Sequence, residues 1–340
     1  MSRASGSWLP HLGKGGQDLA IAPYMEHSDK HRRHFPQPRH MAMRQRALLL
    51  VLAMLVGVLQ APTRAAPPVR EHIEALAALG PRVAGTPAEG RAAGYIAGEL
   101  AALGLDVRVQ PFSIRQGLAS SNIEATLPGR DPAYGVIYAG AHYDSVQGSP
   151  GANDNASGTA VVLELARLLA ADPISPTVRF LAFGAEEIGL RGSAAYVQTL
   201  DGRERLRAYG MLNFDCVGVG SEQIAGSLGD DRALSDLVIA AATRRGYQIG
   251  NDESPGSSDH ISFGAVGIPV AFLYTAGAPT LCGPDYHRST DTPDKVDDRQ
   301  VERVIAIAHA TILDLAAVTR PVEPVQLFMP VVVISSMNQQ

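Results

Sequence analysis

The chain has 340 residues, of which 46% are hydrophobic and 19% are charged, and its formal net charge is −5. This composition is typical of a globular protein with one large domain or two ordinary ones, and the acidic balance argues against a nucleic-acid partner. The two cysteines, Cys216 and Cys282, exclude a disulfide-rich scaffold and a multi-cysteine zinc module.

The N-terminal part of the sequence differs from the rest. Two arginines precede an apolar run at residues 47–59, and small residues and prolines follow it. These are the features of a secretory signal peptide, and the run is short for a transmembrane helix. We therefore expect residues 41–65 to be a signal peptide and the mature protein to be secreted or periplasmic, without stable membrane insertion. An uncleaved N-terminal anchor is the alternative.

Residues 1–40 lie upstream of that signal, which ordinarily begins at its own methionine. We interpret them as a mistaken start or a disordered extension, with Met41 or Met43 as the true first residue. The histidines in this stretch are better explained as part of a segment without a packed core than as a metal site.

Helices and strands are predicted to alternate through one domain at residues 67–320. Helical spacing of apolar residues predicts helices, and short apolar runs between turns predict strands. The predicted elements are helices at 69–80 and 88–104, strands at 105–112, 121–128 and 133–144, a helix at 156–170, a strand at 177–184, a helix at 189–200, a strand at 208–218, a helix at 232–245, a strand at 267–275 and a helix at 298–318. This order predicts a single-domain α/β fold with a largely parallel, mixed central sheet and helices on both faces. Residues 321–340 are a C-terminal tail or one more strand.

Acidic and imidazole side chains are concentrated where the predicted strands end, which is where ligands bind in open α/β sheets. They are His142 and Asp144, Asp154 in the following turn, the pair Glu186 and Glu187, Asp215, and Tyr286 with His287. Each residue alone has a structural explanation, such as a turn, a helix cap or a charge near a helix N-terminus. Their recurrence along one edge of one sheet is better explained by function.

Two imidazoles and several carboxylates match the ligand preference of zinc or a similar divalent ion. Five ligands exceed what one catalytic zinc needs, whereas they suit two metals that share a bridging carboxylate. One glutamate of the adjacent pair can bind metal while the other remains free as a general base. Asp144 lies two positions after His142 on an extended chain, so it can accept the second imidazole N–H and fix the tautomer.

Six motifs in order make the chain resemble the secreted two-zinc aminopeptidases of the aminopeptidase S, aminopeptidase Y and bacterial leucyl aminopeptidase type. They are "AHYDS", "GANDNASGTA", "AEEIGLRGS", "NFDCVG", "SSDHISF" and "YHRSTDTPDKVD", and the resemblance covers roughly residues 70–318. It implies a zinc-exopeptidase-like fold, two Zn²⁺ ions per chain, and peptide substrates with a free N-terminus. We expect a monomer.

The resemblance also implies a role for each site residue. Asp154 would bridge the two metals, His142 and Asp215 would complete one site, Glu187 and His287 would complete the other, Glu186 would be the general base, and Tyr286 would hydrogen-bond the scissile carbonyl oxygen. A cis peptide bond is implied between Asp154 and Asn155.

Two further positions carry open expectations. Asp259 is either a carboxylate that supports the site from behind the ligands or a structural turn residue, and the adjacent His260 is not expected to bind metal. Cys216 and Cys282 both lie close in sequence to expected ligands. Export permits disulfides, so we predict a bond between these cysteines, with free thiols as the alternative.

The function favoured by the sequence is therefore an exported zinc aminopeptidase. A glutaminyl cyclase, which resembles this fold but uses one zinc, is the first alternative. A binding module without catalysis is disfavoured because all expected ligands are retained. A dipeptidase or carboxypeptidase would need a cation for the substrate's C-terminal carboxylate, for which Arg288 is the candidate. A serine hydrolase is disfavoured because no G-x-S-x-G motif is present.

Overall fold

The structure is a computed structural model that describes residues 69–253, 255–276 and 281–321. All of these residues belong to one structural unit, residues 65–340. The expected signal peptide at 41–65, the extension at 1–40 and almost all of the expected tail at 321–340 lie outside the described residues. Within the described part, no helix is both long and apolar enough to cross a membrane.

Helices and strands alternate along the chain. The helices are α2 (Val69–Ala77), α3 (Pro87–Ala102), α4 (Gly158–Ala171), α5 (Arg191–Thr199), α6 (Gly202–Leu206), α7 (Ala233–Arg244), α8 (His260–Gly264) and α9 (Asp298–Val318), with short helical turns η1 (Ala152–Ser157) and η2 (Pro293–Lys295). The strands are β1 (Asp106–Arg115), β2 (Leu118–Leu127), β3 (Val136–His142), β4 (Thr177–Phe183), β5 (Ala208–Phe214), β6 (Glu222–Gly226), β7 (Gly250–Asp252) and β8 (Val270–Ala276).

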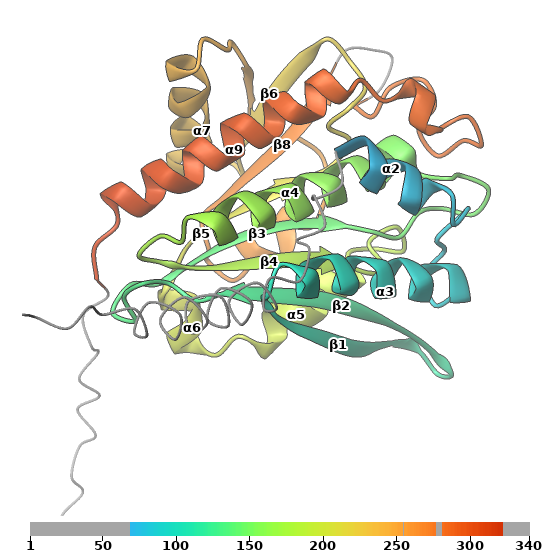
Figure 1. The fold of residues 1–340 in the computed structure, drawn as a ribbon, viewed down its shortest axis with the longest axis horizontal. Coiled ribbons are helices and arrows are strands. Elements are labelled where there is room, and N and C mark those ends of the chain that lie inside the picture. Colours follow the sequence, from blue (N-terminus) through green and yellow to red (C-terminus); the bar gives the residue numbers. More distant parts are fainter. Residues whose placement is uncertain (1–68, 254, 277–280, 322–340) are drawn as a thin grey trace, which may run out of the picture. The chain divides into compact units, whose positions relative to one another are not determined.

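In the described part of the chain, eight strands form one mixed sheet in the order β1-β2-β4-β3-β5-β8-β6-β7 (Figure 1). Its centre is parallel, because β3 pairs in parallel with β4 and β5, and β5 pairs in parallel with β8. The β1/β2, β2/β4 and β6/β8 pairs are antiparallel. The prediction of a largely parallel, mixed sheet is confirmed.

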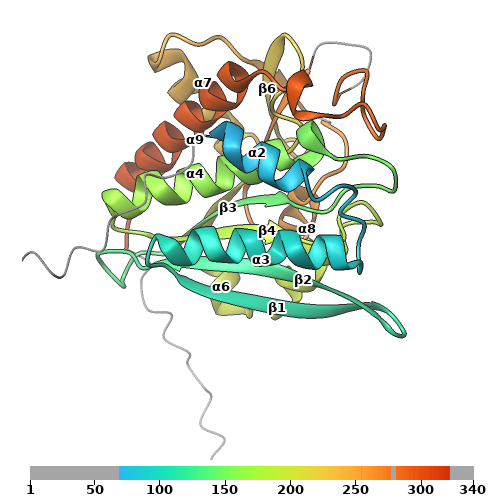
Figure 2. The same cartoon turned by 45° about the vertical axis from the view of Figure 1, so that its right-hand side comes forward.

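Helices cover both faces of the sheet (Figures 1 and 2). α3, α4 and α7 pack on one face, α2 and α9 pack on α4 on that same side, and α5 and α8 pack on the other face. The first face buries an aliphatic core to which α4 contributes Leu165 and α9 contributes Ile312. The second face buries an aromatic cluster that includes Phe183, Tyr196 and Phe263. Burial of each large side chain contributes about 1.5–3 kcal/mol, so the central strands are held firmly between two apolar layers.

Four elements, α6, α8, β6 and β7, were not predicted from the sequence. β7 has the polar sequence Gly-Asn-Asp and becomes a strand by pairing with β6. α6 begins with a capping box, in which Asp201 and Glu204 each accept the backbone N–H of the other. That spacing of an N-cap residue and a glutamate is a recognisable helix start, whereas nothing in the residues of β7 alone favours a strand.

Candidate metal centre

The parallel centre of the sheet brings the predicted site residues to one edge. His142 is the last residue of β3, Glu186 and Glu187 follow β4, and Asp215 directly follows β5. β3 lies between β4 and β5 and runs parallel to both. The carboxyl ends of these strands therefore lie side by side, as the sequence pattern predicts.

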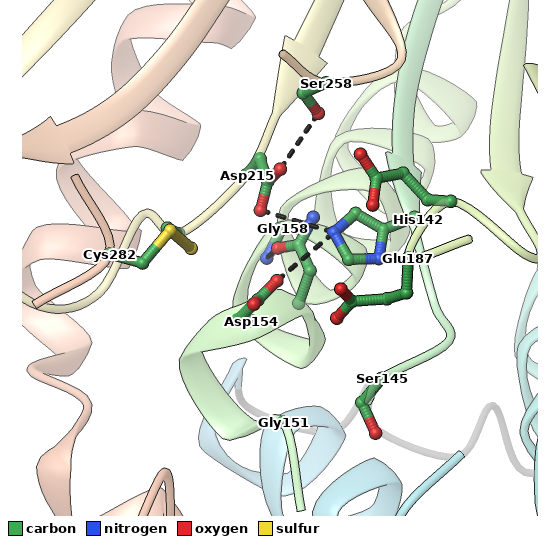
Figure 3. A network of polar contacts seen from close by, with 12 residues as sticks. His142, Ser145, Gly151, Asp154, Gly158, Glu187, Asp215, Ser258 and Cys282 are labelled. Carbon is green, nitrogen blue, oxygen red and sulfur yellow. Dashed lines mark hydrogen bonds and ion pairs between the residues drawn. A yellow bond between two sulfur atoms is a disulfide. The ribbon is translucent and has the colours of Figure 1, made fainter. Parts of the chain in front are cut away.

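His142 forms a first group of donor atoms with two carboxylates. Its Nε2 atom lies 3.3 Å from Asp154 Oδ1 and 3.4 Å from Asp215 Oδ1 (Figure 3). All three side chains are buried, and one donor atom of each lies within 4.8 Å of the others. Three donors this close together can bind one metal ion.

A second group meets at the other oxygen of Asp154. His287 Nε2 lies 3.3 Å from Asp154 Oδ2 and 2.9 Å from Glu187 Oε2. One donor atom from each of these three residues also lies within 4.8 Å of the others. Asp154 thus belongs to both groups through different carboxylate oxygens.

Asp154 lies in an irregular turn that precedes α4. Asp154 and its neighbour Asn155 have non-helical φ and ψ angles, and the peptide bond between them is cis, as the resemblance implied. The Asn155 side chain donates to Phe214 O at 2.8 Å and accepts from Gly158 N at 2.8 Å. Asn155 thus connects this turn both to the end of β5 and to the start of α4. α4 begins at Gly158, two residues later than the predicted helix start.

Backbone strain is concentrated at the same edge. Ala185, Cys216 and His287 have φ values of 56°, 54° and 60° although none is glycine. Such conformations cost about 1–3 kcal/mol each and persist where the surrounding structure requires them. Ala185 precedes Glu186 and Cys216 follows Asp215. The strained backbone therefore helps to orient the side chains of Glu186 and Asp215.

Asp144 supports the site differently from what was expected. Its Oδ1 atom lies 3.5 Å from His142 Nδ1, which is long for a hydrogen bond. Its two carboxylate oxygens instead accept the backbone N–H groups of Glu186 at 3.0 Å and Glu187 at 3.2 Å. Asp144 therefore connects the end of β3 to the segment that carries both glutamates.

Asp215 is held by a serine of the motif "SSDHISF" to which the sequence analysis gave no role. Ser258 Oγ donates to Asp215 Oδ2 at 2.9 Å (Figure 3) and accepts from Asn213 Nδ2 at 2.8 Å. The other oxygen of Asp215 thus stays directed toward His142. The motif pointed to this segment, but the serine's partner Asp215 lies 43 positions away and could not be read from the sequence.

The remaining predicted residues surround these groups. A disulfide joins Cys216 to Cys282, so their sulfur atoms are not metal donors. Tyr286 is 41% exposed, and its ring stacks on His287 with ring centroids 3.7 Å apart. Asp259 is fully buried and lies outside both donor groups. His260 is also buried and stacks on Phe272.

The carboxylates of this edge favour bound cations. Burial and the neighbouring carboxylates raise the pKa values of Glu186 and Glu187 well above the usual range. The charge of His142 lowers these pKa values, but only in part. Burial also raises the pKa of Asp154, but hydrogen bonds from His142 and His287 outweigh it and lower the pKa to about 2. Buried carboxylates short of positive charge attract protons or metal ions.

The donor set fits zinc. Two imidazole nitrogens and three carboxylates are ligand types that zinc prefers. Within the described residues, Glu187 Oε1 and Asp215 Oδ1 are buried and accept no hydrogen bond. Buried polar atoms without partners are costly, so these oxygens are available as metal ligands.

Comparison with known proteins finds peptidases among the relatives of this chain. Residues 122–312 match the sequence profile of peptidase family M28. Aminopeptidase YwaD of Bacillus subtilis is 36% identical over 185 residues, which cover 53% of this chain and 41% of that protein. Leupeptin-inactivating enzyme 1 of Streptomyces exfoliatus is 34% identical over 315 residues, which cover 83% of this chain and 69% of that protein. The chain thus spans less than half of the first relative and about two thirds of the second.

Solved structures share the fold. BSAP, a zinc aminopeptidase from Bacillus subtilis, superposes with a TM-score of 0.69 at 24% identity, over 74% of this chain and 96% of that chain. A glutaminyl cyclase of Bacteroides thetaiotaomicron superposes with a TM-score of 0.62 at 21% identity, over 77% of this chain and 100% of that chain. A fold alone therefore does not distinguish peptide hydrolysis from cyclisation.

Proposed function

Because this chain belongs to peptidase family M28, we propose that it is an exported aminopeptidase that holds two zinc ions and hydrolyses the N-terminal peptide bond of peptides. The observation that carries the proposal is Asp154, whose two oxygens face separate histidine–carboxylate groups. A carboxylate shared in this way suits two ions in one site. Export rests on the signal-peptide features of residues 41–65.

The two groups of donors divide the ligands between them. His142, Asp154 and Asp215 would hold one ion, and Asp154, Glu187 and His287 would hold the other. Zinc supplies Lewis acidity, which polarises a carbonyl group and lowers the pKa of water toward ~7. Asp144 and Ser258 keep the ligands in place through the hydrogen bonds described above.

Glu186 is the proposed general base. It adjoins the ligand Glu187, its backbone is held by Asp144, and it belongs to neither donor group. The positive charge of the two bound ions would lower the raised pKa of Glu186, so that it is ionised at neutral pH. Its carboxylate would take a proton from the attacking water as the water oxygen bonds to the scissile carbonyl carbon, and would then give that proton to the leaving amine nitrogen. The buried Asp259 is proposed to support the site from outside both donor groups, because its charge raises the pKa of Glu186.

Tyr286 is the proposed donor to the carbonyl oxygen as that oxygen becomes negative. Burial of its hydroxyl and the surrounding carboxylates raise its pKa, so the hydroxyl keeps its proton at neutral pH. Its partly exposed ring stacks on His287. The hydroxyl is thereby kept beside the second group of donors, where it can meet a bound substrate.

One assay tests the proposed function. The purified mature chain would be given aminoacyl-anilides and matching N-acetylated anilides, with and without a chelator, and with zinc added back. We expect release of aniline from the free-amine substrates only, loss of release with the chelator and recovery with zinc. Equal cleavage of blocked substrates would contradict an aminopeptidase. Formation of a cyclic product from glutaminyl substrates would identify a cyclase instead.

A further inference from the structure

A buried arginine binds the first residues of the turn that carries Asp154. Arg82 has no exposed surface. Its Nε atom donates to Tyr143 O at 2.7 Å, and its Nη2 atom donates to Gly151 O at 2.8 Å. Its Nη1 atom donates to Pro150 O. Arg82 therefore connects the residue after His142 to the start of the turn through backbone carbonyls.

A buried aspartate binds the next residues of the same turn. Asp291 Oδ1 accepts Asn153 N at 2.8 Å, and Asp291 Oδ2 accepts Asp154 N at 3.1 Å. Its backbone oxygen accepts Ala152 N at 3.2 Å. Asp291 lies four residues after His287. It therefore connects the turn to the segment that carries a ligand of the second donor group.

We propose that Arg82 and Asp291 are positioning residues that fix Asp154 between the two groups of metal donors. This inference rests on the two-zinc function proposed above. The pair, here named the 82/291 clamp, binds successive residues of the turn with charges that match the backbone groups they contact. The cation takes carbonyl oxygens and the anion takes N–H groups, and charge-assisted hydrogen bonds are about twice as strong as neutral ones.

Arg82 packs directly against the backbone of the turn. Gly151 has a φ of 61°, and a Cβ atom at this position would lie 2.8 Å from Arg82 Nη2. The guanidinium therefore lies directly against the turn. The irregular backbone of the turn offers peptide groups that no regular helix or strand satisfies, and Arg82 and Asp291 supply their partners. A displacement at either side chain is passed to Asp154, because few bonds separate them.

Asp291→Asn tests the clamp on the side of His287. An asparagine has one acceptor oxygen, so either Asn153 N or Asp154 N loses its partner and faces an amide NH₂. Zinc binding to the metal-free full chain would be measured at buffered free zinc concentrations. We expect wild type to bind two ions. We expect D291N to bind both ions about 10–100-fold more weakly, because both share Asp154 as a ligand and because other residues that orient ligands have effects of this size.

Two further variants sharpen the test. Asp294→Asn makes the same change at an exposed acid of the same segment, whose carboxylate contacts only its neighbours Thr292 and Lys295, and should bind both ions as wild type does. Arg82→Lys keeps the charge but offers one nitrogen to several carbonyls, and should also weaken zinc binding. Arg91→Lys, at an exposed position of α3, is its control. Excess zinc should restore turnover of D291N.

The outcomes separate the clamp from the proposed function. A wild-type chain that binds fewer than two ions contradicts the two-zinc function and the clamp with it. If wild type binds two ions and the D291N chain binds both as tightly as wild type does, the clamp alone is contradicted. Thermal unfolding of the metal-free chains accompanies the titration. Loss of both ions together with a lower unfolding temperature would mean that Asp291 supports the fold as a whole, which also contradicts the clamp.

Discussion

Asp144 accepts the backbone N–H of Glu186 in a hydrogen bond of 3.0 Å, although the two residues lie 42 positions apart. The same carboxylate accepts Glu187 N and lies beside His142. One buried aspartate therefore joins a proposed ligand of the first ion, a proposed ligand of the second and the proposed base. This carboxylate therefore helps to set the position of the base relative to the metals.

Asp144→Asn should lower turnover while the chain remains folded. The amide has one acceptor oxygen where two backbone N–H groups need one each. We expect kcat/KM or zinc affinity to fall by about 10–100-fold, measured by anilide hydrolysis and by zinc content. Asp230→Asn, at an exposed position, should behave as wild type. Equal loss in both variants would contradict the role given to Asp144.

The two adjacent glutamates should respond differently to the same change. Glu186→Gln removes a proton acceptor, so kcat should fall by about 10²–10⁴-fold while two zinc ions remain bound. Glu187→Gln removes a charged ligand oxygen that faces His287, so zinc content should fall as well. Zinc content and kcat measured on both purified variants distinguish the roles. Retained turnover in E186Q would place the base elsewhere.

Tyr286→Phe should lower kcat with little change in KM. The hydroxyl is proposed to bond the substrate oxygen only as negative charge develops, and loss of one such donor costs about 10²–10³-fold. The ring and its stacking on His287 are retained in phenylalanine. Steady-state kinetics on one anilide would measure the effect. A rise in KM at constant kcat would show that Tyr286 binds the ground state instead.

The disulfide should stabilise the domain. Cys216 and Cys282 close a loop across 66 residues, and loss of such a bond lowers the free energy of unfolding by about 2–4 kcal/mol. Denaturant unfolding of the Cys216→Ser/Cys282→Ser variant would measure the loss. A reductant should shift wild type toward the variant and leave the variant unchanged. Two free thiols in the unfolded, unreduced wild type would contradict the bond.

His260 should make the fold sensitive to acid. Burial lowers its pKa from 6.5 to about 4, so the unfolded chain binds a proton more readily than the folded chain between these values. The free energy of unfolding should therefore fall as the pH is lowered through that window, by at most about 3 kcal/mol from this group. His260→Phe keeps a ring against Phe272 and should flatten this part of the profile.

The matched control for His260 is His309→Gln. His309 is only partly buried and its pKa is lowered less strongly by burial and Arg245. Urea unfolding of the metal-free chains from pH 7 to pH 4 would compare the slopes. A slope in H260F equal to that of wild type would show that other groups cause the acid sensitivity.

Sequence pattern alone was sufficient to predict the central sheet and the strand ends at which His142, Glu187 and Asp215 lie. Apolar runs and helical periods are properties of neighbouring residues, and parallel strands align their carboxyl ends whatever the loops between them do. Strands such as β7, which form only by pairing with β6, have no such local signal and were missed.

Only the tertiary structure decided what surrounds the proposed ligands. Asp144 binds N–H groups 42 and 43 positions away, and Asp291 binds N–H groups 138 and 137 positions away. Their partners are backbone atoms, which almost every residue carries, so no pattern of side chains in the sequence records these contacts. The types of residue that can bind zinc could be predicted, whereas the supports that hold them depend on the packing of distant segments.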